Sequence, residues 1–222
     1  MRALGLFLLI LLPLGTACNP DQEIPLTKEE LLQRAARRSD LKTVKILLDR
    51  GADIETRHPG NGWTPLMWMA VRGHAEGVRL LKSRGANIEA RDLKGQTALV
   101  AAARWGQQDG VAAMLDAGAN IAARDNIGWT AMMAAAFKGQ DKMAGFLLDR
   151  GASIEARDPD GHDPLMLAAM KGHAQVVKLL LLRGASPGRR DTEGNTAADL
   201  AEKSGYDDLA TLLRGPKASS GR

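Results

Sequence analysis

The sequence predicts an all-α solenoid of helix-turn-helix units joined by short β-turn fingers, and three observations support this prediction. First, glycines recur with a period of 33 residues along most of the chain. Second, 45% of the 222 residues are hydrophobic but only 4% are aromatic, so Ala, Leu, Val and Met must fill the core. Third, this hydrophobic content, together with 25% charged residues, favours a packed fold over extended disorder.

The charge balance and the cysteine content exclude several classes of protein. The net charge is +4, but residues 18–214 carry 27 basic and 26 acidic residues, a net charge of +1. This near-balance argues against a nucleic-acid-binding surface over the fold as a whole. Cys18 is the single cysteine, which excludes an intrachain disulfide and a cysteine-rich metal site.

Residues 1–17 have the order of regions found in a signal peptide. A positively charged start precedes an apolar run over residues 3–14, and small residues follow it. The run of about 12 residues is shorter than the roughly 20 that a helix needs to cross a bilayer. The sequence therefore predicts export rather than a permanent membrane span.

Cys18 stands where the apolar run ends, and the segment before it resembles a bacterial lipobox. In that signal the cysteine is lipidated and becomes the mature N-terminus, although the place that usually holds Leu is here Gly15. Ordinary cleavage after Ala17 also fits the small residues, and an uncleaved anchor is a third alternative. We favour lipidation of Cys18, because the only cysteine of the chain lies at this point.

The residue after the cysteine indicates to which membrane a lipidated chain would be directed. Asn19 is not the Asp that marks inner-membrane retention in many such proteins. A lipidated chain is therefore expected at the outer membrane, facing the periplasm, with residues 18–26 as a short tether. If the leader is cleaved without lipidation, the protein is expected to be secreted.

Two glycine series define the repeat. The second series follows a Leu-rich stretch and precedes Ala, and it contains one step of 34 residues because the connection at 57–61 is one residue longer. A constant period with one insertion in a turn is typical of stacked units. The two series are Gly62, Gly95, Gly128, Gly161 and Gly194, and Gly51, Gly85, Gly118, Gly151 and Gly184.

Residues 63–91 show what one period predicts. Thr64-Pro65 begins a first helix, with proline at an early position where its missing N–H is harmless, and Gly73 ends that helix. A second helix is expected at 75–83, and Gly85 supplies the left-handed residue that terminates it. Residues 87–91 are expected to be extended. Neither helix buries its apolar side alone, so stability must come from neighbouring units.

These features closely resemble the ankyrin repeat. The family pattern appears as GWTPLMWMAVRGHAEGVRLLKSRGAN and GHDPLMLAAMKGHAQVVKLLLLRGAS, with looser versions between them. The resemblance covers residues 27–214, with Thr27 and Glu30 as a capping box at its start. It implies four full repeats at about 59–92, 93–125, 126–158 and 159–191. An N-terminal cap at 27–58 and a C-terminal cap at 192–214 enclose them, and a disordered tail follows at 215–222.

The sequence departs from the family pattern at one place in each repeat. Ankyrin repeats usually have His after Thr-Pro-Leu, tied by hydrogen bonds to the adjoining turn, and Asp163 here also replaces the Thr once. The departure puts in doubt the polar bonds between turns, not the fold, because Met fills the core adaptably. The residues at the His place are Met67, Val100, Met133, Met166 and Asp199.

No catalytic site is predicted, and neither a cofactor nor a metal. His74 and His173 occupy the Gly-His place at the end of the first helix, where a structural contact is expected. His58 and His162 lie in separate turns and cannot form a metal pair on one helix. No serine has a recognisable nucleophile context, and no glycine-rich loop matches a phosphate-binding pattern.

The resemblance implies a concave binding face made of first helices and turn tips. An exposed aromatic beside a cation in successive repeats resembles a protein-interface hot spot. The alternative is that these rings pack on the neighbouring repeat, and Trp63 and Trp129 are expected to be structural. The candidate partner-binding residues are Trp68, Arg72, Arg104, Trp105, Phe137, Lys138, Met170 and Lys171, with the turn tips His58, Asn61, Leu93, Lys94, Asn126, Ile127, Pro159 and Asp160.

A row of arginines also recurs once per repeat and is usually followed by Asp. It has two interpretations, a stripe for an acidic partner or a structural element paired with local groups. We prefer the structural interpretation, because an Asp directly follows every one of these arginines except Arg57. The arginines are Arg57, Arg91, Arg124, Arg157 and Arg190.

The expected function is a non-enzymatic protein–protein interaction scaffold in the bacterial cell envelope. A monomer that holds, inhibits or stabilises a periplasmic partner protein is expected, without nucleic acid and with membrane contact only through the N-terminal lipid. A secreted effector acting on host proteins is one alternative. An enzyme with an unrecognised site is another.

Overall fold

The computed structural model describes residues 26–215, and this part of the chain contains twelve α-helices and no strand. The predicted all-α solenoid is confirmed. No helix of this part has the length and hydropathy needed to cross a membrane. The predicted leader, Cys18 and the rest of the tether before Leu26 lie outside the described residues, as does the tail after Gly215. The helices are α1 (Lys28–Arg37), α2 (Leu41–Asp49), α3 (Pro65–Val71), α4 (Ala75–Ser83), α5 (Ala98–Arg104), α6 (Gln108–Asp116), α7 (Ala131–Phe137), α8 (Asp141–Asp149), α9 (Pro164–Met170), α10 (Ala174–Leu182), α11 (Ala197–Lys203) and α12 (Asp207–Arg214).

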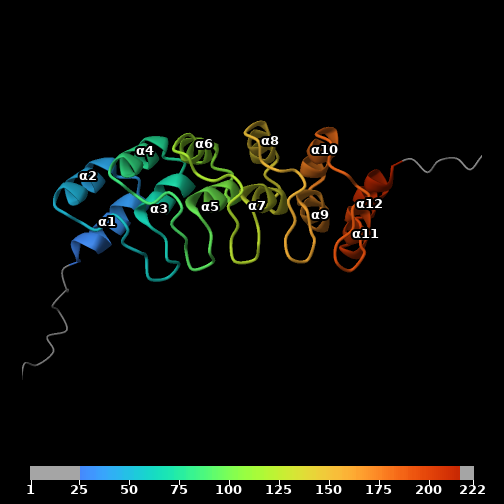
Figure 1. Cartoon of the computed structure of the whole chain (residues 1–222), viewed down its shortest axis with the longest axis horizontal. Coiled ribbons are helices and arrows are strands. Elements are labelled where there is room, and N and C mark those ends of the chain that lie inside the picture. Colours follow the sequence, from blue (N-terminus) through green and yellow to red (C-terminus); the bar gives the residue numbers. More distant parts are fainter. Residues whose placement is uncertain (1–25, 216–222) are drawn as a thin grey trace, which may run out of the picture.

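The helices pair in chain order and the pairs stack side by side (Figure 1). Odd-numbered helices pack on odd-numbered neighbours, as in α3 on α5 and α7 on α9, and each also packs on the even-numbered helix of its own pair. Finger loops between pairs extend along one edge of the stack (Figure 1). Each unit therefore depends on its immediate neighbours, as in other solenoids.

The helix starts follow from their capping residues. Thr27 Oγ1 accepts a hydrogen bond from the Glu30 N–H at 3.1 Å, and the Glu30 carboxylate accepts one from the Thr27 N–H at 2.8 Å, which confirms the predicted capping box. Asp163 caps α9 at the place where other odd-numbered helices have Thr. These side chains satisfy backbone donors that have no partner within the helix.

Glycines end the helices as predicted, but one connecting segment differs from the prediction. Gly73 and Gly85 have φ of 70° and 91°, which is the left-handed region that glycine adopts without strain. Residues 87–91, expected to be extended, contain a turn at 88–89. The Asn87 side chain accepts a hydrogen bond from the Glu89 N–H at 3.0 Å, a local bond that favours the turn.

Small residues allow the helices to approach closely. All of residues 98–103 in α5 and all of α7 except Phe137 are buried. In α6, a β-carbon added at Gly110 would lie 2.0 Å from the carbonyl oxygen of Ala70 in α3. The spacing of the helix layers is therefore set by side chains of minimal size.

Candidate functional site

The predicted partner-binding residues share one place in the fold. They lie on the face formed by the odd-numbered helices and the finger loops, which we call the inner face, and all except Trp68, in the middle of α3, lie at the C-terminal ends of these helices. Arg72, Trp105, Lys138 and Lys171 are the residues that cap these helices. Trp68, Arg104, Phe137 and Met170 lie in the helices that precede them.

Trp68 is packed against its neighbours rather than free. Its indole Nε1 donates a hydrogen bond to Gln33 Oε1 at 2.8 Å, and its ring meets the Trp63 ring edge-on with centroids 4.5 Å apart. The guanidinium of Arg37 lies 5.5 Å from the ring centroid. These contacts join the first two helix pairs, so Trp68 has a clear structural role.

Phe137 and Met170 are also half-buried, in a small cluster around Trp129. The Phe137 ring lies 4.7 Å from the Trp129 ring, and the Lys171 ammonium lies 4.8 Å from the Phe137 centroid. Arg104 similarly lies over Trp129 at 5.8 Å. A cation therefore accompanies these rings, and cation–π contacts of this kind contribute modestly at exposed sites.

Trp105 differs from the other predicted rings. It is 61% exposed, although tryptophan is among the largest apolar side chains. Two cations of the predicted set stand next to it in the row of helix ends: Arg104, which is half-buried, and Lys138, which is exposed. Tryptophan and arginine are among the residue types that are enriched at the hot spots of protein interfaces.

The recurring arginines bind backbone carbonyls of the fingers. Arg91 Nη1 donates to the carbonyl oxygen of Gly95 in its own finger at 2.8 Å and to that of Arg124 in the next finger at 2.5 Å. The same pair of bonds starts from Arg57, Arg124 and Arg157. The guanidinium groups therefore link successive fingers, which supports the structural interpretation of this row.

A second row of bonds between fingers was not predicted. Trp63 Nε1 donates to Asp92 Oδ2 at 3.0 Å, and 66 residues further on Trp129 Nε1 donates to Asp158 Oδ2 at 3.1 Å. Gln96 makes the equivalent bond to Asp125 at 3.3 Å. These bonds supply the polar connection that the missing family histidines put in doubt. The sequence carried a signal for them, because a side-chain N–H donor precedes each finger Asp by 29 residues.

The same row places His162 between two carboxylates. Its Nδ1 lies 3.3 Å from Asp158 Oδ2 and its Nε2 lies 3.7 Å from Asp191 Oδ2. Burial raises the pKa of Asp191, but hydrogen bonds from Asn195 and from loop N–H groups, with His162 nearby, outweigh this and hold that pKa below its usual value. These side chains connect the last fingers.

One group of potential metal ligands occurs among the described residues. Ligand atoms of Asp158, Asp160 and His162 lie within 4.8 Å of one another. Asp158 already accepts hydrogen bonds on both oxygens, from the His162 N–H at 2.8 Å and from Trp129 Nε1. The group thus belongs to the bonds between fingers.

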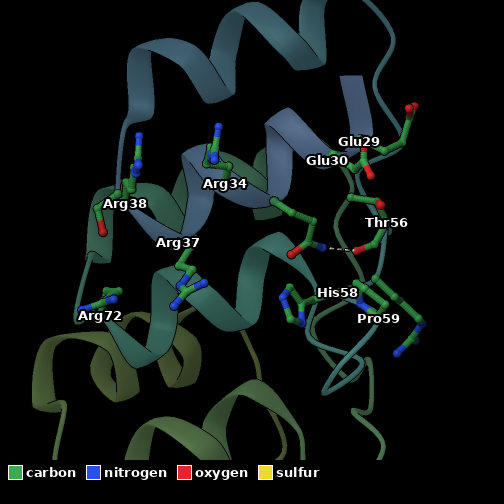
Figure 2. A pocket seen from close by; sticks show the side chains of 12 residues that line it. Glu29, Glu30, Arg34, Arg37, Arg38, Thr56, His58, Pro59 and Arg72 are labelled. Atoms are coloured by element: carbon green, nitrogen blue, oxygen red, sulfur yellow. Dashed lines mark hydrogen bonds between the residues drawn. The ribbon is translucent and has the colours of Figure 1, made fainter. Parts of the chain in front are cut away.

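A groove of about 850 Å³ lies at the N-terminal end of the inner face (Figure 2). It is formed by α1, by the loop around His58 and by the end of α3. Four arginines gather on one side of it, while Glu29 and Glu30 lie near its other end (Figure 2). These arginines are Arg34, Arg37, Arg38 and Arg72.

Sequence reasoning identified only Arg72 among these four. The first helix lacks most of the repeat pattern, so its residues were assigned to a cap. The spacing i, i+3 and i+4 of Arg34, Arg37 and Arg38 could have placed them on one helix face.

Comparison with known proteins supports the repeat assignment. The family model described as "Ankyrin repeats (3 copies)" matches residues 7–92, 32–125 and 89–158. The model described as "Ankyrin repeats (many copies)" matches residues 147–201. Together the matches cover most of the chain.

Similar proteins share parts of the repeat region. The chain is 32% identical over 77 residues to ankyrin repeat domain-containing protein 40 of Mus musculus, covering 35% of this chain and 21% of that protein. It is 39% identical over 79 residues to the ankyrin repeat, SAM and basic leucine zipper domain-containing protein 1 of Mustela putorius furo, covering 36% and 16%. It is 36% identical over 84 residues to the glycerophosphocholine phosphodiesterase gde1 of Schizosaccharomyces pombe, covering 38% and 7%.

The likeness concerns the repeats alone, because the matched part spans about a fifth or less of each of these proteins. Ankyrin repeats are generally interaction modules without catalytic activity, and they usually bind other proteins. The period of the glycines, the stacked helix pairs and the family matches agree. The chain belongs to the ankyrin repeat family.

Proposed function

We propose that this protein is a non-enzymatic scaffold that binds a partner protein through its inner face. The observation that carries the proposal is Trp105, whose ring is 61% exposed at the middle of the row of helix ends. Tryptophan is one of the residues that are enriched at interface hot spots. The general role of ankyrin repeats in binding proteins supports the same conclusion.

The engagement of the histidines supports a non-enzymatic role. His74 Nδ1 accepts a hydrogen bond from the Gly77 N–H at 3.1 Å and so caps α4. His173 Nε2 lies 3.0 Å from the carbonyl oxygen of Phe137, between two repeats. His162 connects fingers, as described above. His74 thus caps its own helix, while His162 and His173 join neighbouring repeats. An enzyme with an unrecognised site is the alternative.

The binding proposal is tested with Trp105→Ala. A partner is first captured by the wild-type protein and identified, and its affinity is then measured for both forms by isothermal titration calorimetry. Loss of a hot-spot ring should cost about 1–3 kcal/mol, or roughly 5- to 150-fold in affinity. The matched control is Leu182→Ala, which removes an 82% exposed apolar side chain from the end of α10 in the other helix layer. Equal affinity of wild type and Trp105→Ala would show that the inner face is not the interface.

The proposal includes a location in the bacterial cell envelope. We place the protein in the periplasm as a monomer, anchored to the outer membrane through a lipid on Cys18. The leader at 1–17 and the position of the single cysteine support this. A form released without lipid would instead be a secreted effector acting on host proteins.

Mass spectrometry of the mature protein tests the anchor. We expect an N-terminus at Cys18 with the added mass of a lipid, and we expect Cys18→Ser to move the protein to the soluble fraction or to stall its processing. Binding of the partner should be unchanged by this substitution, because the interface lies on the repeats. A mature N-terminus without lipid mass would contradict the anchor and favour secretion.

A further inference from the structure

The two helix layers differ in whether the cations at their helix C-termini form ion pairs. In the even-numbered layer, arginines cap four of the helices (Arg50, Arg84, Arg150 and Arg183), and the last three of them pair with an Asp of the preceding repeat. Arg84 lies 2.7 Å from Asp49, Arg150 lies 3.0 Å from Asp116 and Arg183 lies 2.8 Å from Asp149, measured between Nη1 and Oδ1. Three of the four arginines of this outer row are therefore paired with carboxylates of the protein itself, whereas Arg50 has no such partner among the described residues.

The odd-numbered layer carries an equivalent row without carboxylates. Its cations stand at the C-terminal ends of α1, α3, α5, α7 and α9, and all but one are exposed. Among the described residues, none of them has a carboxylate within the 4.0 Å of a salt bridge. We call this set the basic row: Arg37, Arg38, Arg72, Arg104, Lys138 and Lys171.

The helix dipole alone does not explain the basic row. A cation near a helix C-terminus is favourable, and this accounts for the position of both rows. The outer row adds a carboxylate to three such arginines, whereas none of the six cations of the basic row has a carboxylate partner among the described residues. The difference between the layers therefore points to an anion supplied by another molecule.

The basic row is densest at the groove. Arg34 joins Arg37, Arg38 and Arg72 on one side of the groove, and the Arg37 side chain extends from α1 toward α3 (Figure 2). A groove of about 850 Å³ has room for several residues of an extended peptide. Guanidinium groups bind carboxylates with two parallel hydrogen bonds, which suits them to acidic side chains.

We propose that the basic row binds an extended acidic segment of a partner protein, rich in Asp and Glu, with its N-terminal groove as the strongest point of attachment. This inference rests on the proposed scaffold function and specifies the chemistry of the partner. An acidic polypeptide fits better than a nucleic acid for two reasons. The net charge of residues 18–214 is only +1, and Glu29 and Glu30 near one end of the groove would repel a continuous phosphate backbone.

Two triple variants with the same change of net charge test the proposal. The inner variant combines Arg38→Gln, Arg72→Gln and Lys138→Gln, none of which lies over an aromatic ring. The outer variant combines Arg84→Gln, Arg150→Gln and Arg183→Gln. The probe is a fluorescein-labelled peptide of about 12 alternating Asp and Glu residues, and binding is measured by fluorescence anisotropy at low and physiological salt.

We expect the wild-type protein to bind the acidic peptide and to bind it more weakly as salt is raised. The inner variant should lose about tenfold or more in affinity, while the outer variant should stay within about twofold. Equal losses in both variants would overturn the proposal, because they would reflect net charge alone. Tighter binding of a single-stranded DNA of equal charge would also overturn it, in favour of nucleic acid.

Circular dichroism checks that each variant is folded. If the inner variant does not fold, the single charge reversal Lys138→Glu takes its place, with Arg150→Glu as its control. The captured partner then separates the two proposals. If Trp105→Ala weakens its binding and the inner variant does not, the acidic segment is wrong and the scaffold function stands. If neither variant weakens it, the scaffold function through this face is wrong as well.

Discussion

Asp163 stands where the five other odd-numbered helices have a capping threonine. Its carboxylate accepts a hydrogen bond from the Met166 N–H at 3.0 Å, and the side chain is almost fully buried. Burial raises the pKa of Asp163, and the hydrogen bond from Met166 and the charges of Arg189 and Arg157 offset this only in part. The folded protein therefore holds a proton on Asp163 more readily than the unfolded chain does.

Replacing this residue by the threonine of the other repeats should stabilise the protein at neutral pH. A raised folded pKa favours the fold below the unfolded pKa, and this contribution is lost as pH rises through the folded pKa. Asp163→Thr should therefore increase the free energy of unfolding at pH 7 and increase it less at pH 4, where Asp163 is more protonated. Urea denaturation at both values measures this. A gain of the same size at both pH values would show that ionisation of Asp163 is not the cause.

Truncation of two tryptophans should change the stability of the protein to very different extents. Trp129 is only 9% exposed, donates to Asp158 and contacts Phe137, so Trp129→Ala should lower the free energy of unfolding by about 3–5 kcal/mol. Trp105 is 61% exposed, so Trp105→Ala should change it by less than about 0.5 kcal/mol. Urea denaturation followed by circular dichroism measures both. A loss of several kcal/mol for Trp105→Ala would mean that this ring is part of the fold rather than free for a partner.

At the scale of helices, the contact between layers depends on where glycine stands. Gly110 in α6 faces the backbone of α3, where an added β-carbon would lie 2.0 Å from the Ala70 oxygen. Gly145 in α8 has helical geometry too, but its added β-carbon would meet only the end of the Leu179 side chain, at 3.7 Å. The same residue type thus has a packing role in one helix and not in the other.

Alanine at the two sites should separate these roles. Gly110→Ala forces α6 away from α3 and should destabilise the protein by at least about 2 kcal/mol. Gly145→Ala should stabilise it by about 0.5–1 kcal/mol, because alanine has the better helix propensity. Thermal unfolding of both variants gives the comparison. Stabilisation by both substitutions would contradict the close approach of α6 to α3.

At the scale of the molecule, the stack is held by contacts between neighbours. The last pair, α11 and α12, joins the rest through the packing of α11 on α9 and through the bonds of Thr192 to the carbonyl oxygen of Asp160. Nothing in the pattern of helix contacts makes the first pairs depend directly on the last. A solenoid of this kind has a stability close to the sum of its units and interfaces.

Removal of residues 192–222 should therefore shorten the stack without unfolding it. Without α11, the face of α9 that packs on it becomes exposed to water. We therefore expect the midpoint of thermal unfolding to fall by about 10 °C, while the remaining helices persist at 25 °C. Circular dichroism measures both quantities. Complete loss of the helical signal would show that the last pair is required by the whole stack.

The sequence by itself determined the solenoid, its period and its helix starts and stops. These follow from local rules, because Thr27, Thr64 and Gly85 act on residues within a few positions of themselves. Local rules also have limits: the turn at 88–89 was missed although Asn87 is a turn-forming residue.

The tertiary structure alone decided which side chains are engaged and which remain free. Trp68 and Trp105 were both predicted to lie on the binding face, yet Gln33 and Arg37 of the preceding unit contact the first, whereas the second is 61% exposed. Likewise, Arg84 is neutralised by Asp49 while Arg72 has no carboxylate partner among the described residues. The physical reason is that these contacts join residues about one repeat apart, so they depend on how neighbouring units pack.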